Sequence, residues 1–220
     1  MAFKHICNNP EERSKITYSW KVWSELFNEA ELNTLNDYLS TLDMQRATTQ
    51  EDIFLAQNTH TQNQNNNTNT DIRVSSIKFL TLEPETEWIF TRFNWVIEQI
   101  NHYFYGYDLN GYDSIQYGVY DSTELGRYGW HMDTHMNDRV DGYFETRKLS
   151  LSFLLNEPGL DFEGGEFQLN SGTAEAQADT LTLKKGDLVA FSSFLLHRVA
   201  PVTRGIRKSL VIWVTGPKFK

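Results

Sequence analysis

The chain has 220 residues, 40% hydrophobic and 22% charged, so it is long enough to bury a core and has an ordinary globular composition. Its formal net charge of −9 argues against a nucleic-acid surface, because phosphate binding requires a basic patch. A single cysteine excludes an intrachain disulfide, and the absence of about 18 consecutive apolar residues argues against a membrane-spanning helix.

The compartment can also be inferred from the sequence. The N-terminal residues contain no apolar segment of signal-peptide length. The lone cysteine, Cys7, is compatible with a reducing environment. We therefore expect a cytoplasmic protein without a membrane partner.

Residues 26–43 have the pattern of an amphipathic helix. Asn28 lies three residues before Glu31, as a capping box requires. Four leucines recur on one helical face, namely Leu32, Leu35, Leu39 and Leu42. The next segment, residues 56–71, is almost free of apolar side chains, so it cannot form a buried core. We predict a mobile loop over about 46–71 and hypothesise that it closes over the substrate as a lid.

Residues 72–80 are predicted to form a strand, and residues 84–104 a helix with Pro84 near its first turn. From residue 112 onward the periodicity shortens to that of strands. We predict about seven or eight of them, including residues 114–120, 147–156, 165–169, 180–183, 187–192 and 208–214.

Helices followed by strands are typical of an α+β protein, here mainly β, whose second part is a β-sandwich or jelly roll. We therefore expect a single domain over residues 1–220. Its N-terminal helical support would cover about 18–111 and its jelly-roll core about 112–216.

Candidate metal ligands begin with the segment His131-Met132-Asp133. If this segment is extended, residues two apart share a face, so His131 and Asp133 would project together. Two histidines and one carboxylate form the facial triad of Fe(II) enzymes, which leaves positions open for a co-substrate and O₂. We expect His197 to be the third ligand, brought across the sandwich by a loop after the strand near 187–194.

Arg207 is a candidate for binding an anion. On a strand it would share a face with Ser209, Val211 and Trp213. A guanidinium that points into a sandwich would be a costly unpaired charge unless it binds a carboxylate, which it can do through two hydrogen bonds. A dicarboxylic co-substrate could chelate iron with one end and reach Arg207 with the other.

Each residue alone also has an ordinary structural interpretation. A lone His-x-Asp is common at surfaces. His197 could be a core histidine whose ring nitrogens are hydrogen-bonded within the protein, and Arg207 could be a solvated residue at a strand edge. His135 competes as a ligand because it lies four residues after His131, although a strand would place it too far along. The joint pattern on predicted strands favours one metal site.

The chain resembles the prolyl 4-hydroxylase-like Fe(II)/2-oxoglutarate dioxygenases, specifically the bacterial and phage PKHD-type hydroxylases. The resemblance covers roughly residues 72–214 and rests on IRVSSIKFL, IQYGVY, RYGWHMD, RKLSLSFLLN, FEGGEFQL and KGDLVAFSSFLLHRVAPVTRGIRKSLVIWV. The segment LHRVAPVTRGIR is the most specific of these, and ELFNEAELNTLNDYL adds a weaker likeness. The resemblance implies a double-stranded β-helix, the cupin-like jelly roll, with flanking N-terminal helices.

The resemblance also implies roles for individual residues. It assigns iron to His131, Asp133 and His197, and the distal carboxylate of 2-oxoglutarate to Arg207. Tyr120 would donate a hydroxyl to that carboxylate.

The segment before the His-x-Asp motif is longer here than in animal prolyl hydroxylases, so Tyr128 and Tyr117 remain alternatives to Tyr120. In FEGGEF, Gly164 and Gly165 would allow a tight hairpin or a close strand approach.

The implied cofactors are Fe(II), 2-oxoglutarate and O₂, with ascorbate as reductant, and the products are succinate, CO₂ and a hydroxylated substrate. No catalytic residue is assigned beyond the metal centre. We expect the mouth to be lined by Tyr128, Trp130, Arg127 and Trp213. Aromatic walls suit the ring of proline, so the predicted partner is a proline-containing peptide or protein. The alternatives are a hydroxylase of a free amino acid or other small molecule, and a non-catalytic jelly-roll binding module.

Overall fold

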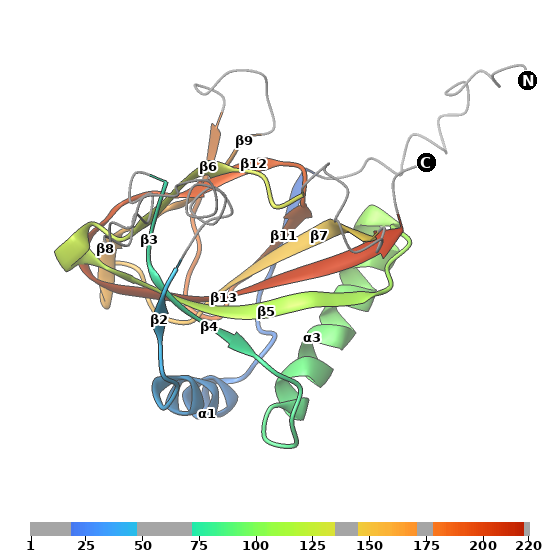
Figure 1. The fold of residues 1–220 in the computed structure, drawn as a ribbon, viewed down its shortest axis with the longest axis horizontal. Coiled ribbons are helices and arrows are strands. Elements are labelled where there is room, and N and C mark those ends of the chain that lie inside the picture. Colours follow the sequence, from blue (N-terminus) through green and yellow to red (C-terminus); the bar gives the residue numbers. More distant parts are fainter. Residues whose placement is uncertain (1–18, 48–71, 135–144, 171–177, 218–220) are drawn as a thin grey trace, which may run out of the picture.

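The computed structural model describes residues 19–47, 72–134, 145–170 and 178–217. Two antiparallel sheets face each other, and two helices cover the outer side of the larger sheet (Figure 1). This arrangement confirms the predicted fold class, a mainly β jelly roll with flanking N-terminal helices.

The larger sheet has the strand order β1-β11-β7-β13-β5-β4-β2, and β8 pairs with β13. In chain order its strands are β1 (Trp20–Trp23), β2 (Gln45–Arg46), β4 (Ser76–Leu80), β5 (Gly111–Asp121), β7 (Glu145–Leu154), β8 (Phe162–Gly164), β11 (Leu188–Ser192) and β13 (Val202–Pro217). β13 is the longest of them and pairs with both β5 and β7, so it forms the middle of the sheet.

The smaller sheet has the order β10-β9-β12-β6-β3. Its strands are β3 (Arg73–Val74), β6 (Arg127–His131), β9 (Phe167–Asn170), β10 (Ala178–Leu181) and β12 (Leu196–Val199). β12 pairs with β6 on one side and with β9 on the other. The smaller sheet therefore brings the segment that ends at residue 131 beside the segment around residue 197.

The two predicted helices form close to their expected positions. Helix α1 (Glu29–Ser40) begins with the predicted capping box: the Glu31 amide donates to Asn28 Oδ1 at 2.9 Å, and the Asn28 amide donates to Glu31 Oε2 at 2.8 Å. Helix α3 (Glu87–Ile100) continues into a π-helical turn, η2 (Asn101–Tyr105), and a 3₁₀ turn, η3 (Ser122–Glu124), follows β5.

Two hydrophobic cores divide the molecule, one between the larger sheet and the helices and one between the two sheets. Alternation along β5 sends Ile115 and Tyr117 into the helix-side core, whereas Tyr120 belongs to the core between the sheets. The functional groups described below lie in this second layer.

The structure corrects several sequence-based expectations. The strand predicted over 72–80 is interrupted at Ser75, so β3 joins the smaller sheet and β4 the larger one. β1 and β2 were not predicted, and both extend the larger sheet from a region expected to be helical support. The local sequence does not reveal this because strand pairing is decided by distant partners. The proposed lid, apart from Arg46 and Ala47, lies outside the described residues.

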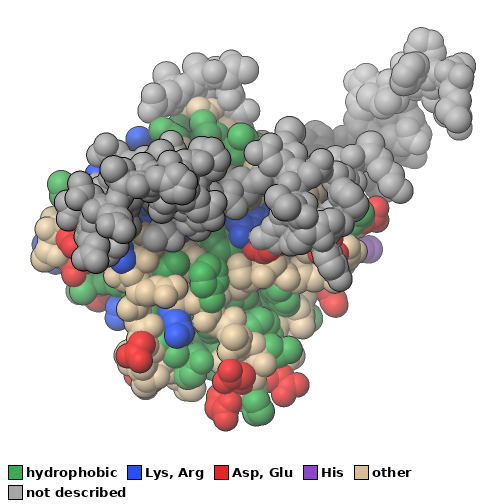
Figure 2. Space-filling model, in the orientation of Figure 1, with side chains coloured by type: hydrophobic (Ala, Val, Ile, Leu, Met, Phe, Trp, Pro, Cys, Tyr) green, Lys and Arg blue, Asp and Glu red, His purple; other side chains and the backbone are tan. Residues whose placement is uncertain are grey.

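The distribution of basic side chains on the surface is consistent with the net negative charge of the chain. On the face shown in Figure 2, and outside the grey atoms, Lys and Arg side chains are scattered and do not form one continuous patch. Within the described ranges no helix is long and apolar enough to cross a membrane.

Candidate metal and co-substrate site

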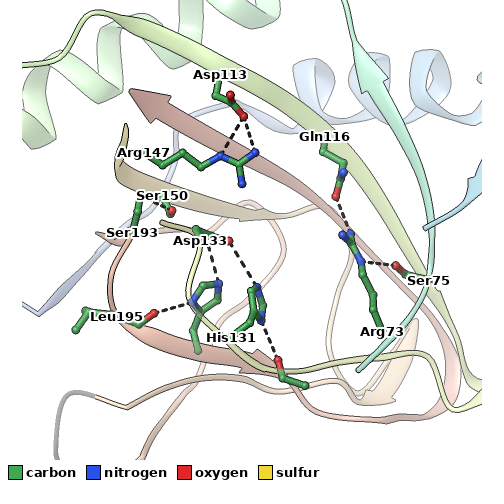
Figure 3. A network of polar contacts seen from close by, with 12 residues as sticks. Arg73, Ser75, Asp113, Gln116, His131, Asp133, Arg147, Ser150, Ser193 and Leu195 are labelled. Carbon is green, nitrogen blue, oxygen red and sulfur yellow. Dashed lines mark hydrogen bonds and ion pairs between the residues drawn. The ribbon is translucent and has the colours of Figure 1, made fainter. Parts of the chain in front are cut away.

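His131, Asp133 and His197 converge, as the sequence pattern predicts. One ligand atom from each lies within 4.8 Å of the others, and this is the only such group of three within the described residues. The Nε2 of His131 is 3.6 Å from Asp133 Oδ1, and the Nε2 of His197 is 3.4 Å from Asp133 Oδ2. Figure 3 shows the carboxylate of Asp133 beside the His131 imidazole.

The elements explain this convergence. His131 ends β6, and its cross-strand Cα partner on β12 is His197, so a strand and not a loop delivers the third residue. Asp133 follows β6, and its amide donates to the Ser193 carbonyl at 2.9 Å in the turn between β11 and β12. Met132, between the two, is 51% exposed and points away from the site.

Both imidazoles are oriented by backbone carbonyl groups. His131 Nδ1 lies 2.8 Å from the Gly129 oxygen, and His197 Nδ1 lies 2.9 Å from the Leu195 oxygen. A carbonyl can only accept, so each Nδ1 carries a proton, and in the neutral imidazole Nε2 then presents a lone pair. This is the tautomer that a metal-binding histidine requires.

The charge states suit a cation between these groups. Burial lowers the pKa of His197 to about 4, although the Asp133 carboxylate acts in the opposite sense. Burial alone would raise the pKa of Asp133, but His197 and His131 hold it well below its usual value. The two Nε2 atoms thus face a buried carboxylate whose Oδ2 has no hydrogen-bond partner. A divalent cation would satisfy all three groups.

A β-bulge shapes the wall beside His131. The register on β12 advances from His197 to Val199 while its partner on β6 moves from His131 back to Tyr128. Two residue steps on β12 therefore match three on β6, and the extra residue in β6 turns Tyr128 to the same face as His131. Their rings stack with centroids 3.5 Å apart and an interplanar angle of 14°.

The three residues open onto one pocket between the sheets. It is lined by Arg73, Gln116, Tyr120, Tyr128, His131, Asp133, Ser152, Phe167, Phe191, His197, Val199, Ser209, Val211 and Trp213. Of the four residues predicted at the mouth, Tyr128 and Trp213 line it.

Arg127 and Trp130 do not line the pocket. The Trp130 ring lies under the Arg198 guanidinium, 4.6 Å from its centroid, and Arg127 donates to the Leu125 carbonyl at 3.2 Å. The bulge explains the difference, because it breaks the alternation that would have placed Trp130 beside Tyr128.

Arg207 is buried at 1% exposure next to this pocket. Its Nη1 donates to Ser209 Oγ at 3.1 Å, and its Cζ lies 5.6 Å from the ring centroid of Tyr120, its cross-strand partner on β5. Burial lowers the pKa of the guanidinium, against the influence of Tyr120. Arg207 has no carboxylate partner among the described residues. It contacts the pocket through Ser209 and Tyr120, which line it.

The structure separates the three candidate tyrosines. Tyr117 packs in the helix-side core, and Tyr128 stacks on His131. Tyr120 alone of the three both lines the pocket and lies beside Arg207. The competing ligand His135 lies outside the described residues.

Gly165 shows why the Gly-Gly pair is needed. Its φ of +65° favours glycine, and a Cβ there would lie 2.9 Å from Arg207 Cδ and 2.9 Å from Val202 Cγ2. The predicted close approach is confirmed, and it occurs directly over the aliphatic part of Arg207.

Two polar groups near the pocket were missed. Arg73 lines it from β3, and Arg147 donates to Asp113 at 3.0 Å while its guanidinium covers Trp213 at 4.1 Å. Nothing in the local sequence singles out Arg73, because its position depends on the break at Ser75.

Comparisons with known proteins agree with this geometry. Residues 115–215 match the family model of the 2OG-Fe(II) oxygenase superfamily. A PKHD-type hydroxylase of Psychrobacter sp. (strain PRwf-1) is 37% identical over 98 residues, which are 44% of this chain and 36% of that relative. The chain thus spans well under half of the length of this curated relative.

Residues 115–215 are thus similar to the 2OG-Fe(II) oxygenase superfamily, and curated relatives with this similarity are PKHD-type hydroxylases. This superfamily implies Fe(II), 2-oxoglutarate and O₂. Solved structures share the fold of this chain at low identity. A Pseudomonas putida prolyl-4-hydroxylase aligns with a TM-score of 0.65 and 18% identity over 92% of this chain and 95% of its own. A Trichoplax adhaerens prolyl hydroxylase, in complex with a hypoxia inducible factor peptide fragment, aligns with a TM-score of 0.62 and 17% identity over 92% and 86%.

Proposed function

We propose that this chain is an Fe(II)/2-oxoglutarate-dependent hydroxylase in which His131, Asp133 and His197 hold the metal. The main support is the arrangement of two histidine Nε2 atoms around a buried carboxylate whose Oδ2 has no hydrogen-bond partner, while both Nδ1 atoms lie on backbone carbonyl groups. Such a group of donors is unfavourable without a cation, and its composition suits Fe(II) in a facial triad.

When bound, Fe(II) would supply the redox chemistry that converts 2-oxoglutarate and O₂ into succinate, CO₂ and a hydroxylated product. Arg207 and Tyr120 would bind the distal carboxylate of 2-oxoglutarate, with the guanidinium oriented by its hydrogen bond to Ser209. The rings of Tyr128 and Phe191 pack against the two imidazoles and keep water from that side. No side chain acts as a general acid or base in this scheme, and ascorbate serves as the external reductant.

The leading substrate is a peptidyl prolyl residue. Tyr128 and Trp213 give the pocket aromatic walls that suit a flat, apolar ring. Relatives named as hydroxylases and a structural neighbour solved with a peptide fragment support a peptide partner. We also propose that residues 1–220 form one domain.

The test is succinate formation from 2-oxoglutarate with and without Fe(II). We expect turnover in the wild type and its loss in His131→Ala, because one ligand is removed from a three-residue site. His102→Ala, which changes an exposed histidine of η2, is the matched control. Equal succinate formation by H131A and wild type would exclude this mechanism, and no turnover in either protein would favour a binding module.

A specific observation favours a second candidate, a hydroxylase of a free amino acid or other small molecule. The pocket contains a buried arginine, Arg73, that an internal prolyl residue does not require. Mass spectrometry of the products distinguishes the candidates: a metabolite that gains one oxygen atom, without a peptide product, decides for the small molecule.

A further inference from the structure

Arg73 is a buried cation in the wall of the pocket. It is 7% exposed and lines the same pocket as His131 and Asp133. Its Nε donates to Ser75 Oγ at 3.0 Å and its Nη2 donates to Gln116 Oε1 at 2.7 Å (Figure 3). These two bonds fix the plane of the guanidinium, and Nη1 donates to no acceptor within the described residues.

Among the described residues, no side chain neutralises the charge of Arg73. Its partners are a hydroxyl, an amide and the face of the Tyr128 ring, which lies 4.5 Å from its Cζ. Arg147 differs, because Asp113 neutralises it. Within the described residues no carboxylate lies within ion-pair distance of Arg73. A guanidinium remains charged in proteins, and burying it without an anion is costly.

Arg73 lies close to the proposed metal site. The Tyr128 ring lies between Arg73 and His131, and it stacks on the imidazole at 3.5 Å. The cation is therefore one aromatic ring away from a proposed metal ligand. An anionic group held there would belong to a molecule that reaches the metal centre.

Arg73 and Arg207 occupy different places. Arg207 lies beside Tyr120, whereas Arg73 is bonded to Gln116, and these two residues of β5 share a face four positions apart. At about 3.3 Å per residue, the Cα atoms of Gln116 and Tyr120 are about 13 Å apart. Because the two guanidinium groups lie at different residues of β5, a co-substrate that reaches Arg207 need not occupy Arg73.

We propose that Arg73 binds a carboxylate of the substrate, so that this enzyme acts on a molecule whose carboxylate lies close to the hydroxylated carbon. The inference rests on the proposed function and specifies its substrate class. A free amino acid, the C-terminus of a peptide and an acidic side chain next to a prolyl residue all offer this group. Arg73 grips it through a charge-assisted hydrogen bond from Nη1.

Calorimetry on the protein loaded with Mn(II) and 2-oxoglutarate tests this without turnover, and the bound 2-oxoglutarate occupies Arg207. The probes are matched pairs: L-proline and L-prolinamide, an acetylated tripeptide ending in proline as acid or amide, and a blocked peptide with Pro-Asp or Pro-Asn. We expect the acid of at least one pair to bind at least about tenfold more tightly than its neutral partner. The pair that shows the preference identifies the source of the carboxylate.

In Arg73→Gln the acid should lose this advantage while the affinity for 2-oxoglutarate stays unchanged. Arg204→Gln, which removes an exposed positive charge from β13, should retain the preference. If R73Q does not fold, the comparison of acids with amides in the wild type decides alone.

Any one of three outcomes would overturn the proposal. The first is that the acids bind no better than their neutral partners, and the second is that no probe of any pair binds to the loaded protein. The third is that the preference for the acid persists in R73Q. Failure of the proposed function is distinct, because 2-oxoglutarate would then fail to bind in the presence of Mn(II).

Discussion

Asp133 is only 4% exposed, yet its Oδ2 has no hydrogen-bond partner, and two imidazole nitrogens lie 3.4 and 3.6 Å from its carboxylate oxygens. A buried polar atom of this kind is rare in proteins and requires an explanation. The proposed explanation is a cation, since the two histidines already use their Nδ1 protons on backbone carbonyls.

Asp133→Asn should therefore weaken metal binding. The substitution keeps the shape of the side chain but removes the charge, and we expect Mn(II) affinity to fall by at least about 100-fold, because even indirect partners of a metal are worth 10–100-fold. Calorimetry measures the affinity, and Asp37→Asn on the exposed surface of α1 is the control. An unchanged dissociation constant in D133N would assign the metal elsewhere.

Gly165→Ala should disturb the co-substrate site without touching the metal ligands. A Cβ at this position would lie 2.9 Å from Arg207 Cδ. We expect the dissociation constant of 2-oxoglutarate to rise by roughly tenfold or more, because a small misplacement of a binding group can cost up to about 100-fold.

Gly159→Ala is the matched control for this change. Gly159 has a φ of +81°, and no atom lies within 4 Å of the place that a Cβ would take, so the variant tests the same backbone strain without the steric clash. Equal 2-oxoglutarate affinities in G165A and G159A would show that the approach to Arg207 has no functional role.

At the scale of elements, β6 and β12 form the site because they are paired, and the bulge in β6 decides which side chains enter the pocket. The helices act at a distance from it. Helix α1 buries Leu32, Leu35 and Leu39 in the helix-side core, and neither its cap nor its exposed face contacts the pocket.

Asn28→Ala should consequently separate stability from ligand binding. Loss of the capping box should lower the free energy of unfolding by about 1 kcal/mol. Chemical denaturation measures this change, and the affinity for 2-oxoglutarate should remain at the wild-type value. Asn33→Ala, at an exposed position of the same helix, should leave stability nearly unchanged. A loss of ligand affinity in N28A would mean that α1 supports the site directly.

The sequence predicted those features that depend on local pattern or on residue chemistry. The capping box, the two helices and the convergence of His131, Asp133 and His197 belong to this class. The bulge that turns Trp130 outward was not predictable, because it exists only in the register between two strands.

The interruption at Ser75 was missed for the same reason. A continuous strand over 72–80 satisfies the local alternation, but β3 and β4 pair with different strands in different sheets. Arg73 reaches the pocket only through this crossing, so its place could not be deduced from the sequence.

At the scale of the whole molecule, the proposed site spans both sheets. The proposed metal ligands belong to the smaller sheet and its connecting turn, whereas Arg207 and Tyr120 belong to the larger one. A co-substrate bound to both groups would connect the two layers of the sandwich (Figure 1).

Binding should therefore stabilise the folded protein. At about 100 times the dissociation constant, Mn(II) with 2-oxoglutarate should add about 2.7 kcal/mol, or a rise in Tm of roughly 5–10 °C. Differential scanning calorimetry checks this, and the rise should disappear in Asp133→Asn. A rise of equal size in D133N would place the stabilising ligands at another site.

The two carbonyl contacts that hold the imidazoles have one more consequence. Gly129 and Leu195 set the tilt of both rings before any ion arrives, and Tyr128 packs flat against one of them. The two imidazole rings thus lose their rotational freedom during folding, so a metal ion would bind to side chains that are already positioned. Apoprotein and holoprotein should accordingly share one backbone conformation here, and loss of the ion should empty the site without dismantling it.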